Sequence, residues 1–216
     1  NNNSSDLNQN SSWSFWSEGT ISIGKIGDTS NVTLVFSEQV SNFSNDDIIV
    51  QNGTLSTMTT SDNITWTGTF TSTSNIEDTT NILTLGTFYT DLAGNTGPSA
   101  TTSNFEIDTS LPTIISITPS WGSHLNATED NSSGTIIVVT SGVEDGQTVT
   151  VGLNGTNYTG SVSSNSVTVT ISATDLQALS EGTNTITANV SDIAGNAASQ
   201  SSTTFVYDKT SPSISS

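Results

Sequence analysis

Two loops in this 216-residue chain repeat a set of oxygen-bearing side chains that could bind a metal ion. Asp91 is followed four positions later by Asn95, and Asp192 is followed in the same way by Asn196. Each loop offers a carboxylate and an amide oxygen close together, and the glycine before each asparagine permits a sharp backbone turn. Calcium prefers six to eight such oxygens at about 2.3–2.6 Å. The pattern therefore predicts a calcium-binding loop in each half of the chain.

Other acidic residues are placed where they could complete the first site. Asp108 ends a strand-like run just before a linker, and Glu129 and Asp130 follow the first strand-like run after that linker. We expect one set of residues to hold a calcium ion at the junction of two modules: Asp91, Asn95 and Asp108, joined by Glu129 or Asp130. A shared ion would replace repulsion between carboxylates with coordination and would stiffen the hinge.

The second copy of the set consists of Asp192, Asn196 and Asp208. No further module follows it in this sequence, so we expect that site to be incomplete and weak. A purely structural interpretation stands beside the calcium interpretation. In it, Asp91 and Asn95 cap a tight loop, and the glycine is present only for its backbone conformation.

The repeat extends beyond these loops. The run Phe105-Glu106-Ile107-Asp108 recurs about one hundred residues later as Phe205-Val206-Tyr207-Asp208, and each run leads to a proline-closed linker. A period of that length is a whole small domain. We therefore divide the chain into a polar N-terminal segment with an aromatic cluster, 1–18, a first sandwich, 19–111, a second sandwich, 112–212, and the start of the next linker, 213–216.

Within each module, short β-branched runs of period two are separated by Gly, Asn, Asp and Ser. This spacing is typical of antiparallel sandwiches. We predict an all-β protein made of two tandem immunoglobulin-like Greek-key β-sandwiches in a rod-like arrangement. The one helical exception is a single turn capped by Asp175, which would bury Leu176 and Leu179.

Composition excludes several functional classes. With 20 Asp and Glu against 2 Lys and Arg, the net charge of −18 opposes binding to nucleic acid, and no apolar run is long enough for membrane insertion. The chain has no cysteine, and His124 is its single histidine, so a histidine zinc site cannot form. His124 lies in a Gly- and Ser-rich loop without a nucleophile motif, and we predict that the protein is not an enzyme.

Both modules resemble the bacterial immunoglobulin-like repeats of giant surface adhesins, including the RTX-type adhesins. The residues that carry the resemblance are Asp-Leu-Ala-Gly-Asn at 91–95, Asp-Ile-Ala-Gly-Asn at 192–196, and Asp-x-x-x-Pro at 108–112 and 208–212. It covers about residues 19–212. It implies extracellular, cell-surface spacer or adhesive modules, with roles in adhesion and biofilms. It also implies partners in neighbouring modules of the same protein and junctions stiffened by structural calcium.

Two alternative functions remain open. Twelve Asn-x-Ser/Thr sequons would suit an N-glycosylated subunit that assembles with other copies of itself into a surface layer or an extracellular filament. The cluster of Trp13, Phe15 and Trp16 could instead stack on surface glycans, or could dock on a neighbouring subunit. More commonly, such a cluster covers the flank of its own domain.

Overall fold

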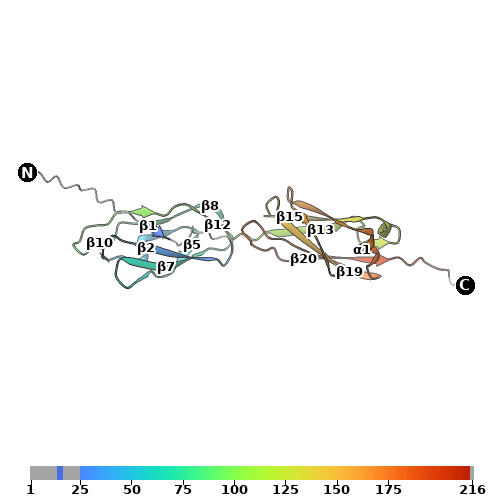
Figure 1. Cartoon of the computed structure of the whole chain (residues 1–216), viewed down its shortest axis with the longest axis horizontal. Helices are drawn as coiled ribbons and strands as arrows, with labels where there is room; N and C mark the ends of the chain where they lie inside the picture. Colours follow the sequence, from blue (N-terminus) through green and yellow to red (C-terminus); the bar gives the residue numbers. More distant parts are fainter. Residues whose placement is uncertain (1–13, 17–24, 215–216) are drawn as a thin grey trace, which may run out of the picture. The chain divides into compact units, whose positions relative to one another are not determined.

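The computed structural model describes residues 14–16 and 25–214, and the side chains of residues 25–214. Internal contacts divide the chain into two compact units, Asn1–Thr109 and Ser110–Ser216. The boundary lies two residues before the one that we placed from the sequence. Both units consist of β-strands joined by short turns, so the predicted all-β class is confirmed (Figure 1).

The first unit contains twelve described strands and one 3-10 turn, η1 (Asn45–Asp47). The strands are β1 (Ser14–Trp16), β2 (Thr29–Val35), β3 (Val40–Ser41), β4 (Ile48–Val50), β5 (Gly53–Leu55), β6 (Thr59–Thr60), β7 (Thr65–Ser72), β8 (Glu77–Asn81), β9 (Leu83–Leu85), β10 (Thr90–Asp91), β11 (Ala100–Thr101) and β12 (Phe105–Asp108). One sheet has the order β1-β2-β7-β5, with β6 also on β7, and the facing strands pair as β11-β9-β4, β12-β8 and β10-β3.

Alternation along these strands builds the core of the first unit. Leu34, Phe70, Leu83 and Leu85 are fully buried, whereas their neighbours along each strand are Thr, Ser, Asn or other partly exposed residues. Successive side chains of a strand point to opposite faces, so each sheet turns one apolar face inward. The strands predicted from runs of period two are confirmed, because that period is the one at which side chains alternate between the two faces of a pleated strand.

Strand β1 corrects the predicted start of the first sandwich. Ser14–Trp16 pairs antiparallel with β2, and Phe15 lies opposite Leu34. This segment therefore belongs to the sheet of the first unit rather than to a separate N-terminal tail. Trp13 and the side chains of Phe15 and Trp16 lie outside the described residues, so the role predicted for the aromatic cluster stays a prediction.

The second unit contains eight strands, one short helix and one 3-10 turn. The elements are β13 (Thr113–Pro119), β14 (His124–Asn126), η2 (Glu129–Asn131), β15 (Gly134–Ser141), β16 (Thr148–Leu153), β17 (Thr156–Ser161), β18 (Ser166–Ile171), α1 (Ala173–Gln177), β19 (Gly182–Asn189) and β20 (Ser201–Asp208). Its two sheets have the orders β13-β15-β18 and β14-β20-β19-β16-β17.

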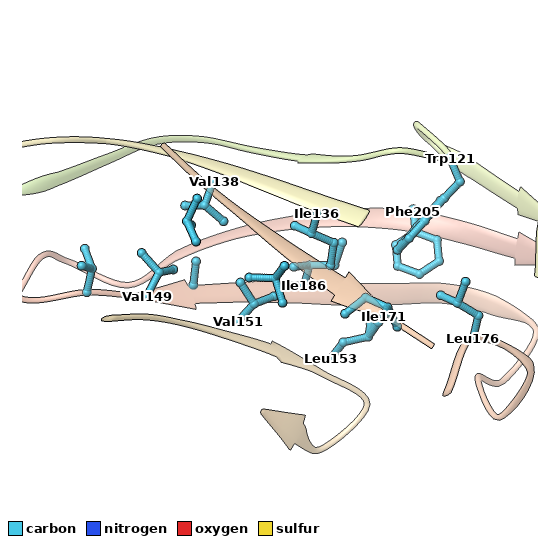
Figure 2. Packing of buried hydrophobic residues seen from close by; sticks show 14 of the residues in the cluster. Trp121, Ile136, Val138, Val149, Val151, Leu153, Ile171, Leu176, Ile186 and Phe205 are labelled. Carbon is cyan, nitrogen blue, oxygen red and sulfur yellow. The ribbon is translucent and has the colours of Figure 1, made fainter. Parts of the chain in front are cut away.

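The core of the second unit lies between these sheets (Figure 2). Ile136 and Val138 of β15 face Val151 and Ile186 of the other sheet, and all four are fully buried. Trp121, which lies in the turn between β13 and β14, is 8% exposed and meets the Phe205 ring edge-on at 5.2 Å between centroids. A loop tryptophan thus closes one end of this core.

Helix α1 confirms the predicted turn but corrects its cap. The N-cap is Ser172, whose hydroxyl accepts a 3.1 Å hydrogen bond from the backbone N–H of Asp175 and donates one of 2.7 Å to its carboxylate. Asp175 is therefore the third residue of the helix rather than its cap. Leu176 and Leu179 are buried, as predicted.

Candidate functional site: the acidic loops

The first acidic loop is closed by hydrogen bonds between its two polar side chains, Asp91 and Asn95. Asp91 ends β10, and its two carboxylate oxygens accept hydrogen bonds from the backbone N–H of Asn95 at 2.8 Å and from Asn95 Nδ2 at 2.6 Å. These donors, the side chain of Asn95 first, hold the pKa of Asp91 below its usual value. Gly94 has φ +90°, a conformation that residues with a Cβ rarely adopt.

The second loop has the same construction in a buried setting. Asp192 accepts hydrogen bonds from Asn196 N at 2.7 Å and from Asn196 Nδ2 at 2.9 Å, and Gly195 has φ +92°. Asp192 and Asn196 are 4% and 1% exposed, whereas Asn95 is exposed and Asp91 half-buried. Glu144 adds a further bond by accepting the backbone N–H of Ile193 at 2.8 Å.

This bonding matches the loop-capping interpretation. Each aspartate already receives two N–H donors, and each asparagine presents its amide nitrogen, not its oxygen, to the carboxylate. Calcium requires several converging oxygens. Across residues 25–214, no three or more His, Asp or Glu side chains come together in a way that could hold a metal ion. The loops as they stand do not form a calcium cage, and calcium binding stays a prediction.

In the first unit, the strand register separates residues that we had grouped in one site. Ala100 lies opposite Leu85, whereas Asp108, eight residues further along, lies opposite Glu77. Asp91 follows the Leu85 end of this ladder, so roughly 20–25 Å of strand separates it from Asp108. The register thus sets Asp108 apart from Asp91 and Asn95 along the sandwich, and the metal-binding role expected of these residues stays a prediction. A one-dimensional repeat does not show that the two motifs sit at opposite ends of the sandwich.

In the second unit, Asp208 is likewise separated from the acidic loop of Asp192, and it lies instead beside β14. Gly182 lies opposite Tyr207, and Ala188 lies opposite Ser201, so Asp208 is at the end of the sheet remote from Asp192. Strand β14 runs parallel to β20 and places Asn126 beside Asp208. The turn η2, which carries Glu129 and Asp130, follows directly.

These two acidic residues have different surroundings. Glu129 Oε2 accepts the backbone N–H of Asn126 at 3.1 Å and is exposed. Asp130 is 5% exposed and accepts a 2.6 Å hydrogen bond from the Tyr207 hydroxyl. That bond, with burial second, raises the pKa of Tyr207 to about 12. The predicted association of Glu129 or Asp130 with acids of the first unit spans two units and stays a prediction.

The Asp130–Tyr207 pair was not foreseen as a pair, because 77 positions separate its members. Tyr207 had been noted only as part of a repeated strand, at the position that Ile107 occupies in the first copy. A tyrosine replacing an aliphatic residue in an inward-facing position was the one available signal, since a buried hydroxyl needs a partner.

The family comparison concerns the first unit. Residues 18–107 match a family model described as a bacterial Ig-like domain. The resemblance to bacterial immunoglobulin-like modules that the motifs indicated is thereby confirmed. No curated protein matches the sequence.

Several solved structures are similar to this chain over most of its length. A structure of a 1.5-MDa bacterial ice-binding adhesin, concerned with its retention at the host cell surface, is 24% identical with a TM-score of 0.47, over 85% of this chain and 59% of that one. A Ca2+-stabilized adhesin that helps an Antarctic bacterium bind ice is 21% identical with a TM-score of 0.45, over 85% and 45%. Fibronectin(III)-like modules of Clostridium thermocellum CbhA are 14% identical with a TM-score of 0.37, over 86% and 88%. The chain thus spans about half the length of the two adhesin structures.

A shallow groove of about 500 Å³ lies on the Ig-like domain of the first unit. Its lining is uncharged and consists of Asn31, Thr33, Ser56, Thr57, Thr59, Thr67, Gly68 and Thr69. It contains neither a pair of carboxylates for acid–base chemistry nor an aromatic ring on which a sugar could stack. The groove therefore supports neither hydrolysis nor the stacking mode of glycan binding.

The remaining catalytic candidate, His124, lies in β14 of the second unit. His124 is exposed, and its Nδ1 lies 3.0 Å from the hydroxyl of the adjacent Ser123. A catalytic triad needs a histidine oriented by a carboxylate and a nucleophile held at a cleft.

In the part of the chain that the structure describes, no helix has the length and apolar character needed to cross a membrane.

Proposed function

We propose that this chain is a pair of extender modules of a large extracellular surface protein. The observation that carries the proposal is the way in which the chain passes from one sandwich to the next. The last residue of the first unit and the first buried residue of the second are each anchored in their own unit. A connection this short limits the relative motion of the two modules, which suits a spacer.

The first anchor is Thr109. Its backbone N–H donates to Ile76 O at 2.7 Å, and its hydroxyl donates to Thr73 O at 2.7 Å. The second anchor is Pro112, which is buried beside Gly142; a Cβ on that glycine would lie 3.5 Å from the Pro112 Cα. Only Ser110 and Leu111 stand between these anchors. Two residues leave little conformational freedom for a hinge.

The absence of cysteine permits a direct test with spin labels. Cysteines introduced at Ile49 and Thr204, both exposed and one in each unit, would carry the pair of labels. We expect a narrow distribution of label distances, and a broader one after four Gly and Ser residues are inserted between Ser110 and Leu111. An equally broad distribution in both proteins would contradict the extender proposal.

Calcium stiffening is the part of the proposal that rests on the sequence. The net charge of −18 gives the chain a surplus of oxygen ligands. The loop aspartates are engaged by asparagine amides, so an ion would have to displace these bonds or use other acids. Thermal melts in EDTA and across a calcium titration, with magnesium as the control, decide the question.

A melting temperature that rises strongly with calcium, and rises less after Asp108→Ala or Asp192→Ala, supports a calcium-stabilised extender. Ligand binding to the folded state alone raises stability in proportion to the logarithm of ligand concentration above Kd. A melt that calcium leaves unchanged shows that the acids only solvate the surface. The spin-label experiment, carried out in EDTA, then still tests the extender role by itself.

A further inference from the structure

One side of the second unit consists of two open sheet edges. Strand β17 is the last strand of the order β14-β20-β19-β16-β17, and β18 is the last strand of β13-β15-β18. The two strands are adjacent, because a Cβ on Gly160 would lie 2.5 Å from a methyl group of Val167. Among the described residues, β17 pairs with β16 alone, so one row of its backbone N–H and C=O groups has no strand partner.

This side is also uncharged. From position 146 to position 174 the sequence contains no Asp, Glu, Lys, Arg or His, although 10% of the chain is charged. That segment supplies the whole of β16, β17 and β18. Four of the six residues of β17 are exposed: Thr156, Asn157, Thr159 and Ser161.

Soluble proteins usually protect an edge strand with a charge, a proline, a bulge or a very short strand. Several edges away from this side of the second unit use those devices. Strand β13 contains a register shift between Ile114 and Ser116 and ends at Pro119, β14 has three residues, and β8 with β12 carries Glu77 and Asp108. Strand β17 has six residues in unbroken register with β16 and has none of these devices.

Acidic groups do lie at the margins of this side. Asp145 Oδ1 accepts the backbone N–H of Ser164 at 2.7 Å, and Asp175 is bonded to Ser172 beside the half-buried Tyr158. Two copies brought together here would meet through a neutral centre with an acidic rim. Any other orientation of the two copies would bring acidic surfaces together, and the two chains, each of net charge −18, would repel each other there.

We propose that β17 is a self-association surface at which a second copy of this chain adds its own β17 in antiparallel orientation. An antiparallel pair of identical edges is two-fold symmetric and satisfies the outward backbone groups of both strands. The partner is a second copy because identical uncharged edges are self-complementary. For a surface protein, the consequence is lateral pairing of neighbouring chains, which goes beyond the extender role.

The first test is sedimentation of the whole chain, produced in a host that does not glycosylate because Asn154 and Asn157 on this edge are sequons. We expect the weight-average mass to rise from 22.4 kDa towards twice that value between roughly 10 µM and 1 mM. Association should strengthen as salt rises from about 0.01 M to 0.5 M, because screening weakens the repulsion of the acidic rims. A chain that stays monomeric at all salt concentrations overturns the proposal.

A charge variant with a matched control identifies the surface. Thr159→Lys places a cation on the open edge, whereas Thr204→Lys places the same cation on the exposed side of the interior strand β20. We expect the first variant to lower the association constant about tenfold and the second to leave it nearly unchanged. Equal effects of the two variants would mean that association uses another surface.

Disulfide trapping tests whether two β17 strands meet. The chain has no cysteine of its own, so single cysteines at positions 157, 158 and 159 should form covalent dimers faster than random collision allows if two β17 strands meet. We expect a dimer from at least one of these positions and none from Thr185→Cys on β19. A dimer yield at Thr185→Cys equal to that of the edge variants counts against the proposal. The spin-label result for the linker is independent of these outcomes.

Discussion

The hydroxyl of Tyr207 donates a 2.6 Å hydrogen bond to Oδ2 of Asp130, and both side chains are buried. Asp130 lies in η2, near the beginning of the second unit, and Tyr207 lies in its last strand. The bond therefore ties the two ends of the domain sequence together at one end of the sandwich. A buried carboxylate is costly unless donors compensate for the lost hydration, so this contact ties the position of η2 to that of β20.

We expect Tyr207→Phe to lower the free energy of unfolding of the second unit by about 1–3 kcal/mol, because Asp130 remains buried without its donor. Urea titration followed by the 19F resonance of fluorinated Trp121, the single tryptophan of that unit, isolates the transition. If Tyr207→Phe costs the same in an Asp130→Ala background, the hydrogen bond is not the cause.

Alkaline pH should destabilise both units, chiefly through the one fully buried tyrosine of each. Burial raises the pKa of Tyr89 to about 12, and the bond to Asp130 raises that of Tyr207 to about 12. The unfolded tyrosine titrates near 10, so between pH 10 and pH 12 the unfolded state loses a proton that the folded state keeps. The contribution of these two tyrosines to the free energy of unfolding is therefore fully present below pH 10 and is lost as the pH rises towards 12.

Urea midpoints measured from pH 8 to pH 12 check this prediction. Tyr89→Phe and Tyr207→Phe should each flatten the decline for the unit that carries the substitution. A midpoint that falls equally steeply in the double variant would assign the decline to other groups.

The two acidic loops should differ in their contribution to stability. Asp192→Ala removes a buried acceptor and leaves the backbone N–H and the amide of Asn196 without their bonds, at a cost of about 2–4 kcal/mol. Asp91→Ala breaks the same bonds in an exposed loop, where water replaces them, and should cost much less. The unfolding of each unit in EDTA, followed by the 19F resonance of fluorinated Trp66 in the first unit and of fluorinated Trp121 in the second, gives the comparison. Equal losses would contradict the prediction.

Thr140 offers a stabilising substitution. Its side chain is 1% exposed, and its hydroxyl has no hydrogen-bond partner. Thr140→Val keeps the shape and removes the buried polar atom, so we expect a gain of about 1 kcal/mol in unfolding free energy. Thr140→Ser is the control, since it keeps the hydroxyl, removes a methyl group and should destabilise. A loss of stability in Thr140→Val would show that the hydroxyl is satisfied by water.

Local features of this protein could be predicted from local sequence. Alternation in runs such as Thr148–Leu153 predicted strands, because a side chain's face follows directly from its parity along the pleat. The repeated Asp-x-Ala-Gly-Asn loop predicted both the positive φ of Gly94 and the Asp91–Asn95 contact, since all of these groups lie within five positions. The same locality allowed the short helix α1 to be predicted, although its cap proved to be Ser172.

By itself, then, the sequence determined the all-β class, the hundred-residue module, the loop construction and the acidic surface, since each depends on composition or on residues close in the chain. The tertiary structure alone decided which motifs share an end of a sandwich. The register of Asp108 against Glu77 separates it from Asp91, and the parallel pairing of β14 with β20 brings Asp130 to Tyr207. Register and strand order are set by packing between residues far apart in the chain, so no local pattern carries them.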